Sequence, residues 1–163
     1  MLRALVLVAL GLMLVPSFAQ AQYKEGDWEL TIGGQGTSDK DIDTGDFSLN
    51  VGVSYFFTPA LEAALRQGVI FSDGGSAWGG TTTVAGDWNF ALDKWVPFVG
   101  ANIGYQYGDT FAEDSWIAGP EAGIKYFVNS TTSIQGTISY EFNLNNGFDE
   151  GSFFYGVQLA VRL

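Results

Sequence analysis

Apolar and polar residues alternate along residues 95–107, WVPFVGANIGYQY. The odd-numbered positions are apolar and carry aromatic residues at both ends, whereas the even-numbered positions from Gly100 onward are small or polar. Successive side chains of a β-strand point to opposite faces, so this pattern predicts a strand with one continuously apolar face. The stretch is longer than an ordinary strand and suits a tilted strand that crosses a bilayer.

The same alternation returns in seven other stretches, at residues 28–37, 46–57, 61–71, 78–90, 116–128, 132–144 and 152–163. The stretch 61–71 contains LEAALRQ, which also has high helix propensity, and we assign it as a strand because both of its neighbours are strands. Consecutive strands joined by short links are antiparallel neighbours. Pro120 lacks the N–H group that a strand ladder needs, so we expect a bulge or broken pairing there.

The links between the strands alternate in length. Longer loops follow the first, third, fifth and seventh strands, and short turns follow the second, fourth and sixth. Outer-membrane barrels have long loops outside the cell and short turns in the periplasm. The pattern therefore predicts that both ends of the chain lie in the periplasm.

Residues 1–21 have the layout of a cleavable signal peptide. Arg3 supplies the positive charge, residues 4–15 form an apolar run that Pro16 ends, and Ala19-Gln20-Ala21 is a small-x-small cleavage site. The alternative is a membrane-anchoring helix, but the run is shorter than the ~20 residues that such a helix needs. We therefore expect a single mature domain at residues 22–163.

The composition excludes several classes of function. The chain has no cysteine and no histidine, which removes disulfides, thiolate metal sites and Ser-His or Cys-His catalysis. The formal net charge of −11 repels phosphate backbones, so we expect no nucleic-acid partner. We predict no enzyme activity, no cofactor and no metal site.

Alternation alone leaves open whether the apolar face points to lipid or, as in lipocalins, into a soluble barrel; Gly26-Asp27-Trp28 even matches the lipocalin G-x-W motif. The bulky residues of eight such faces would overfill the interior of an eight-stranded barrel, whereas the glycine-rich opposite face suits a narrow lumen. All five tryptophans share the apolar face near strand ends, as an aromatic girdle would: Trp28, Trp78, Trp88, Trp95 and Trp116. We therefore predict an all-β, eight-stranded, antiparallel up-and-down transmembrane β-barrel.

Two segments, PFVGANIGYQYGD at residues 97–109 and GPEAGIKYFV at 119–128, resemble motifs of the small OmpA-like outer-membrane β-barrel superfamily. The resemblance implies an eight-stranded barrel in the outer membrane of a Gram-negative bacterium, folded by the barrel assembly machinery. The last strand of such proteins usually ends in an aromatic residue. This chain departs from that pattern, because it ends in Leu163.

The inward face of the predicted barrel carries ionisable residues from most strands: Glu29, Glu62, Arg66, Asp87, Glu121, Lys125, Glu141 and Arg162. Unpaired charges in a narrow interior are unfavourable, so we expect these groups to pair. The candidate charge network consists of Glu62, Arg66, Glu121, Lys125, Glu141 and Arg162. One interpretation is that this network plugs the lumen. The alternative is that it gates a narrow ion path, by exchange of ion-pair partners among Glu62, Arg66, Glu121, Lys125 and Arg162.

Two functions follow from this sequence. The first is a non-enzymatic outer-membrane barrel with a side-chain-packed lumen and a structural or surface-interaction role. The second is a narrow porin-like channel or small-solute transporter gated by lumenal charge pairs. We expect a monomer that contacts outer-membrane lipids and lipopolysaccharide. The acidic loops are either solvated or bind divalent cations, with Asp39, Asp41 and Asp43 as candidate calcium ligands.

Overall fold

The computed structural model describes residues 23–38, 45–72, 76–146 and 151–163. The predicted signal peptide at residues 1–21 and the candidate calcium ligands Asp39, Asp41 and Asp43 lie outside these ranges and stay predictions. Within the described residues, no helix is long and apolar enough to cross a membrane.

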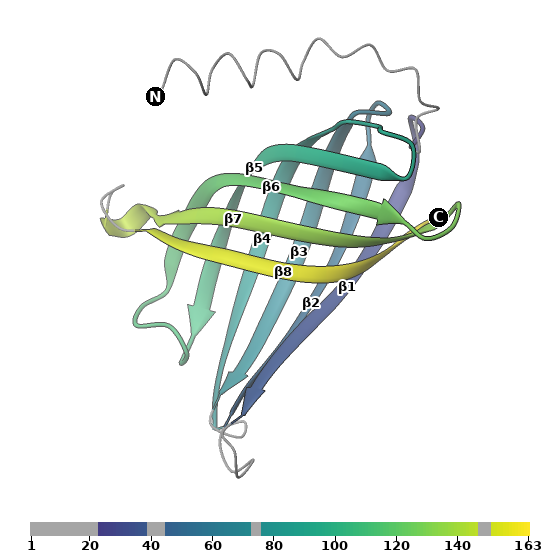
Figure 1. The fold of residues 1–163 in the computed structure, drawn as a ribbon. Helices are drawn as coiled ribbons and strands as arrows, with labels where there is room; N and C mark the ends of the chain where they lie inside the picture. Colours follow the sequence, from purple (N-terminus) through teal and green to yellow (C-terminus); the bar gives the residue numbers. More distant parts are fainter. Residues whose placement is uncertain (1–22, 39–44, 73–75, 147–150) are drawn as a thin grey trace, which may run out of the picture.

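The described chain forms eight strands that close into one antiparallel barrel, in which each strand pairs with its neighbours in sequence and β1 pairs with β8 (Figure 1). The strands are β1 (Trp28–Ser38), β2 (Gly45–Phe56), β3 (Leu61–Ser72), β4 (Ala77–Asn89), β5 (Trp95–Gly108), β6 (Ser115–Phe127), β7 (Thr132–Asn143) and β8 (Gly151–Arg162), with a 3-10 turn (Leu144–Asn146) before β8. The prediction of an eight-stranded antiparallel barrel is confirmed, and the ambiguous stretch 61–71 is a strand.

The barrel has two ends. The terminal end holds the start of β1 and the end of β8, together with the turns after β2, β4 and β6. The loop end is the opposite end, where β1, β3, β5 and β7 finish.

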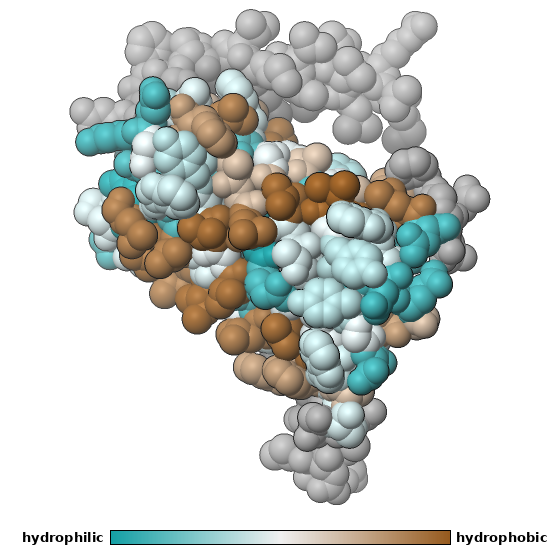
Figure 2. Space-filling view, turned by 180° about the vertical axis from the view of Figure 1, so that it is seen from behind, coloured by the Kyte–Doolittle hydropathy of each residue, from teal (hydrophilic) through white to brown (hydrophobic). Residues whose placement is uncertain are grey.

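The apolar face of each strand forms the outside of the barrel. On β1, Leu30 and Ile32 are about half exposed, whereas Glu29 and Thr31 between them are buried in the interior. Figure 2 shows apolar side chains running across the barrel wall. A continuous exposed apolar wall of this kind is unfavourable in water and suits contact with lipid.

All five tryptophans are on this outer wall, with exposed fractions between 48% and 53%. Three of them, Trp28, Trp88 and Trp95, lie at the terminal end, and the other two, Trp78 and Trp116, lie toward the loop end. Trp78 and Trp88 begin and end the same strand, and ten residues of strand rise about 33 Å. With the tilt of about 40° usual for barrels, the two levels are roughly 25 Å apart, which is the height of a lipid-facing band.

Pro120 interrupts the pairing of β6 with β7. The ladder runs to Ala118↔Phe142 and resumes at Glu121↔Ser139. Both strands advance by the same number of residues across the gap, so the expected break in pairing is found and no bulge is present in this described stretch. On its other side β6 stays paired with β5, including Ala101↔Pro120.

The junction of β1 with β8 is closed over only part of its length. β1 pairs with β2 from Trp28↔Tyr55 to Ser38↔Gly45, but with β8 only from Glu29↔Arg162 to Gly33↔Gln158. Figure 1 shows the two strands together near the C-terminus and diverging toward the loop end. Residues 34–38 of β1 and 151–157 of β8 therefore border an opening in the wall with no ladder across it, within the part of the chain that the structure describes.

Candidate functional site

The candidate site is the lumen, where strand periodicity places ionisable side chains from different strands at nearby heights. Glu29, Glu62, Asp87, Glu121 and Lys125 are all almost fully buried. Small residues on the facing strands make room for them. A Cβ atom at Gly100, for example, would clash with the carboxylate of Asp87.

The first cluster lies at the terminal end and is centred on Lys125. The Nζ atom of Lys125 is 2.8 Å from Oε1 of Glu29 and 2.8 Å from Oε2 of Glu62. The side-chain amide of Asn89 donates to Oε2 of Glu62 at 3.0 Å, and the hydroxyl of Tyr23 donates to Oε2 of Glu29. One cation thus bridges two carboxylates, and neutral donors from Asn89 and Tyr23 stabilise the remaining negative charge.

An aromatic lid covers this cluster. Tyr23, in the segment before β1, stacks on Phe56 with ring centroids 3.8 Å apart and meets Phe127 edge-on at 5.4 Å. The ammonium group of Lys125 lies 4.9 Å from the Tyr23 ring and 5.1 Å from the Phe56 ring, which suits cation–π attraction. Burial, reinforced by the charge of Glu29, raises the pKa of the Tyr23 hydroxyl, so Tyr23 remains a protonated donor.

The second cluster lies nearer the loop end and is centred on Arg66. The guanidinium of Arg66 is 3.0 Å from Oδ2 of Asp87 and 2.8 Å from Oε1 of Glu121. Asn102 donates to Oε2 of Glu121 at 2.7 Å. The two clusters thus place paired charges at two successive heights in the lumen.

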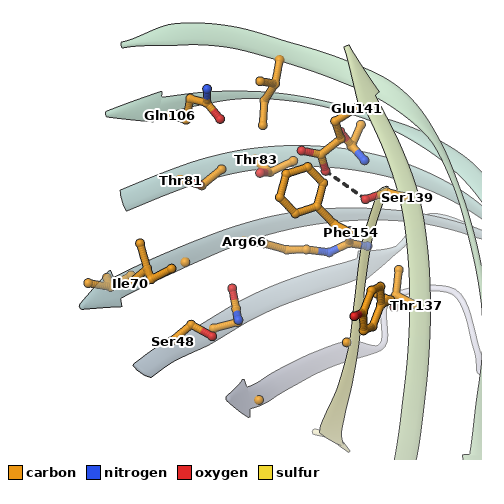
Figure 3. Close-up of a pocket in the computed structure, with 18 of the residues that line it drawn as sticks. Ser48, Arg66, Ile70, Thr81, Thr83, Gln106, Thr137, Ser139, Glu141 and Phe154 are labelled. Atoms are coloured by element: carbon orange, nitrogen blue, oxygen red, sulfur yellow. Dashed lines mark hydrogen bonds between the residues drawn. The ribbon is translucent and has the colours of Figure 1, made fainter. Parts of the chain in front are cut away.

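A cavity of about 310 Å³ lies on the loop-end side of the Arg66 cluster, and we refer to it as the cavity above Arg66. Figure 3 shows Ser48, Thr81, Thr83 and Gln106 on one side of this cavity, with Glu141 and Phe154 on the other. Most of the labelled side chains are polar and uncharged, and Glu141 accepts a hydrogen bond from Ser139 at 3.0 Å. The cavity therefore suits hydrogen bonding more than ion binding.

The six residues of the predicted charge network are divided among different places. Glu62 and Lys125 are in the first cluster, Arg66 and Glu121 are in the second, and Glu141 lines the cavity. Arg162 belongs to neither cluster. It lies at the terminal end, where its guanidinium is 3.6 Å from Asp27 and donates to the backbone oxygen of Ser130 at 2.6 Å.

Three important partners are outside the predicted network. Glu29 and Asp87 lie at alternate positions that point into the lumen, as the sequence indicates. Alternation does not give the height of a residue in the barrel, however, so it does not show that Glu62 and Asp87 are paired neighbours on β3 and β4. Tyr23 precedes the first strand, so no periodicity indicates its place. Among the described residues, no group of three or more His, Cys, Asp or Glu side chains is placed to hold a metal ion.

The closed barrel, its apolar wall and its polar lumen with paired charges define the class of fold: a small eight-stranded β-barrel of the outer-membrane type, as the resemblance to OmpA-like barrels predicted. The structure is similar to the N-terminal β-barrel domain of Pseudomonas aeruginosa OprF, with a TM-score of 0.66 and 16% identity, covering 86% of this chain and 98% of that one. It is also similar to the outer membrane protein OprG of Pseudomonas aeruginosa, with a TM-score of 0.60 and 14% identity, covering 88% and 98%.

A third similar structure is Ail of Yersinia pestis in a phospholipid bilayer nanodisc, with a TM-score of 0.57 and 14% identity, covering 85% of this chain and all of that one. At these identities the likeness concerns the fold alone. No protein-family model and no curated protein sequence matches this chain.

Proposed function

We propose that this protein is a non-enzymatic β-barrel of the Gram-negative outer membrane, with a plugged lumen and a structural or surface-interaction role. Both chain ends lie on the periplasmic side in this proposal, and the loops that follow β1, β3, β5 and β7 meet the outer surface and its lipopolysaccharide. The apolar wall supports membrane placement, and the likeness in fold to outer-membrane barrels supports this particular membrane.

The observation that carries the proposal is the buried Lys125 cluster under its aromatic lid. The side chains of Lys125, Glu29 and Glu62 are each no more than 2% exposed, and Tyr23 and Phe56 cover them. A through-path for ions would have to separate a buried lysine from two carboxylates, and breaking such a group leaves uncompensated charge in a low-dielectric interior. A plug of this kind favours a role in the wall and loops over conduction.

The test is single-channel recording of the refolded mature protein in planar bilayers, with folding verified by comparing unboiled and boiled samples on a gel. We expect a folded barrel that inserts and gives no discrete conductance steps. Reproducible steps from the wild type would contradict the proposal.

The second candidate is a narrow channel gated by charge pairs. The cavity on the loop-end side of Arg66 favours it, because that half of the lumen is already hollow, and the two charge clusters with their aromatic lid lie between it and the terminal end. In this case the wild type conducts, and Arg66→Ala changes the conductance. Arg162→Ala is the matched control, because Arg162 pairs with Asp27 outside both clusters and its loss should leave conductance unchanged.

A further inference from the structure

The open part of the junction between β1 and β8, which we call the seam, is the least covered part of the barrel wall. On β8, Phe153, Tyr155 and Val157 are 67%, 77% and 66% exposed, whereas no large hydrophobic side chain among the described residues of β1 to β7 exceeds 53%. The difference begins at the residue where pairing with β1 ends, Gly33↔Gln158. The edge of β8 is thus uncovered in the loop-end half of the wall.

The seam joins two hollows on opposite sides of the wall. Inside is the cavity above Arg66, and outside is a largely apolar groove that crosses β6, β7 and β8. Gly34, Tyr155, Gly156 and Val157 line both of them. Residue 136, on the floor of the outer groove, is a glycine whose missing side chain would meet nothing within 4 Å, so the groove is open there.

The seam lies in the part of the wall that lipid is expected to cover. On β1, Gly36 pairs with the outward aromatic residue Phe47 of β2, and on β8, Phe153 pairs with Tyr140 of β7. The seam therefore starts on the terminal-end side of the aromatic side chains at the loop end. Backbone N–H and C=O groups without partners are strongly unfavourable in hydrocarbon. A ligand with hydrogen-bonding groups would satisfy them, whereas a plain hydrocarbon chain would not.

The chemistry of the cavity defines the head group of such a ligand. Asp87, Glu121 and Glu141 outnumber Arg66 near its floor, and Glu141 forms no ion pair among the described residues. The Oδ1 atom of Asn102, a residue that is only 6% exposed and lines the cavity, has no hydrogen-bond partner in the described chain. An excess of negative charge and a free acceptor favour a donor group and disfavour an anion.

We propose that the seam is the entrance of a binding site for a single-chain, uncharged amphiphile from the membrane. Its hydroxyl-bearing head group lies in the cavity beside Asn102. Its polar ester linkage lies between the unpaired edges of β1 and β8, and its aliphatic chain continues into the groove along Ile138, Tyr155 and Val157. The proposal rests on the proposed placement in a bilayer but not on the absence of conduction.

The probe is a monoacylglycerol with a diazirine in its ten-carbon chain, added to the mature protein in phosphatidylcholine nanodiscs and photolysed. Peptide mapping by mass spectrometry should find label concentrated on the segments around Ile138 and Tyr155. Unlabelled 1-decanoylglycerol should compete at concentrations at least about tenfold below those at which decanoate does.

Two pairs of variants separate the seam from general lipid contact. Gly156→Leu adds a side chain at the cavity where a Cβ atom meets nothing within 4 Å, and should lower labelling about tenfold. Gly86→Leu adds the same side chain to the exposed outer face of β4, where a Cβ atom also meets nothing within 4 Å, and should not change labelling. A Gly34→Cys/Val157→Cys disulfide extends the closed junction by one position, with a small shift at the backbone oxygen of Ser48, which lies 2.8 Å from a Cβ atom at residue 34. It should narrow the seam and lower labelling until it is reduced, whereas Leu30→Cys/Val161→Cys, across a pair that is already closed, should have no effect.

Label spread evenly around the wall, or equal competition by decanoate, would overturn the binding site while leaving the membrane placement intact. Unchanged labelling in both Gly156→Leu and the closed-seam variant would overturn it as well. Absence of label on every outward face would overturn both the site and the proposed membrane location.

Discussion

At the scale of single residues, the lumen is organised by a shortage of cations. Lys125 and Arg66 each form ion pairs with two carboxylates. The neutral side chains of Asn89 and Asn102 donate further hydrogen bonds to those carboxylates. Each buried cation is therefore shared, so its loss leaves two acids without a partner. The free energy of unfolding should respond more to the cation than to either carboxylate.

Lys125→Met should destabilise the folded barrel by about 3–5 kcal/mol, since it keeps the volume of the side chain but leaves Glu29 and Glu62 buried and unpaired. Urea unfolding of the refolded protein in lipid vesicles measures this. Lys94→Met is the matched control: Lys94 is an exposed lysine in the turn before β5, and its replacement should change the free energy by no more than about 0.5 kcal/mol.

A triple variant, Glu29→Gln/Glu62→Gln/Lys125→Met, removes the uncompensated charges. It should regain a large part of the stability that Lys125→Met alone loses, because replacing a whole buried ionic group is often close to neutral. If the triple variant were less stable than Lys125→Met, charge pairing would not be the reason for the cluster.

At the scale of strands, the sequence predicts this barrel well because the deciding signal is local. An apolar outer wall and a polar interior impose a period of two on every strand, and that period is visible in β2 (Gly45–Phe56) or β5 without knowledge of their partners. Each observed strand begins and ends within one residue of the predicted stretch. Register is different, because the height at which Glu62 meets Asp87 depends on both strands and on the turns between them.

Pro120 gives a test at this scale. Pro120→Val supplies the missing N–H group and should extend the β6–β7 ladder across its gap, raising the free energy of unfolding by about 0.5–1.5 kcal/mol. Hydrogen exchange should show a protected amide at position 120. Pro59→Ala is the control, because Pro59 lies exposed in the turn between β2 and β3, outside any ladder, so a new N–H group there should not raise the free energy of unfolding.

At the scale of the whole molecule, the barrel is closed by its weakest junction. Seven of its eight strand junctions are paired along most of their length, but β1 and β8, which come from opposite ends of the chain, share only the five pairs from Glu29↔Arg162 to Gly33↔Gln158. Sequence pattern could not predict this, because β8 alternates as regularly as the other strands. The closing junction alone has no connecting turn to set its register, so its length depends on how the whole sheet curves.

The seam predicts where the folded barrel opens first. Backbone amides that face the seam lack ladder partners, so the peptide covering residues 151–157 should exchange its amide hydrogens ahead of the peptide covering residues 158–162 of the same strand. About half of the amides in residues 151–157 should stay protected, since β8 remains paired with β7 from Thr132↔Val161 to Phe142↔Gly151 and alternate residues face that side.

Mass-spectrometric hydrogen exchange in nanodiscs measures both peptides in one experiment, and residues 133–138 of β7, which pair with both β6 and β8, provide the reference. If the two β8 peptides exchanged alike, the junction would be closed along its length in the membrane, and the cavity would have no path to lipid. A faster phase confined to residues 151–157, slowed by the Gly34→Cys/Val157→Cys disulfide, would link the local opening to the seam, because that disulfide ties β8 to β1 next to their last pair, Gly33↔Gln158.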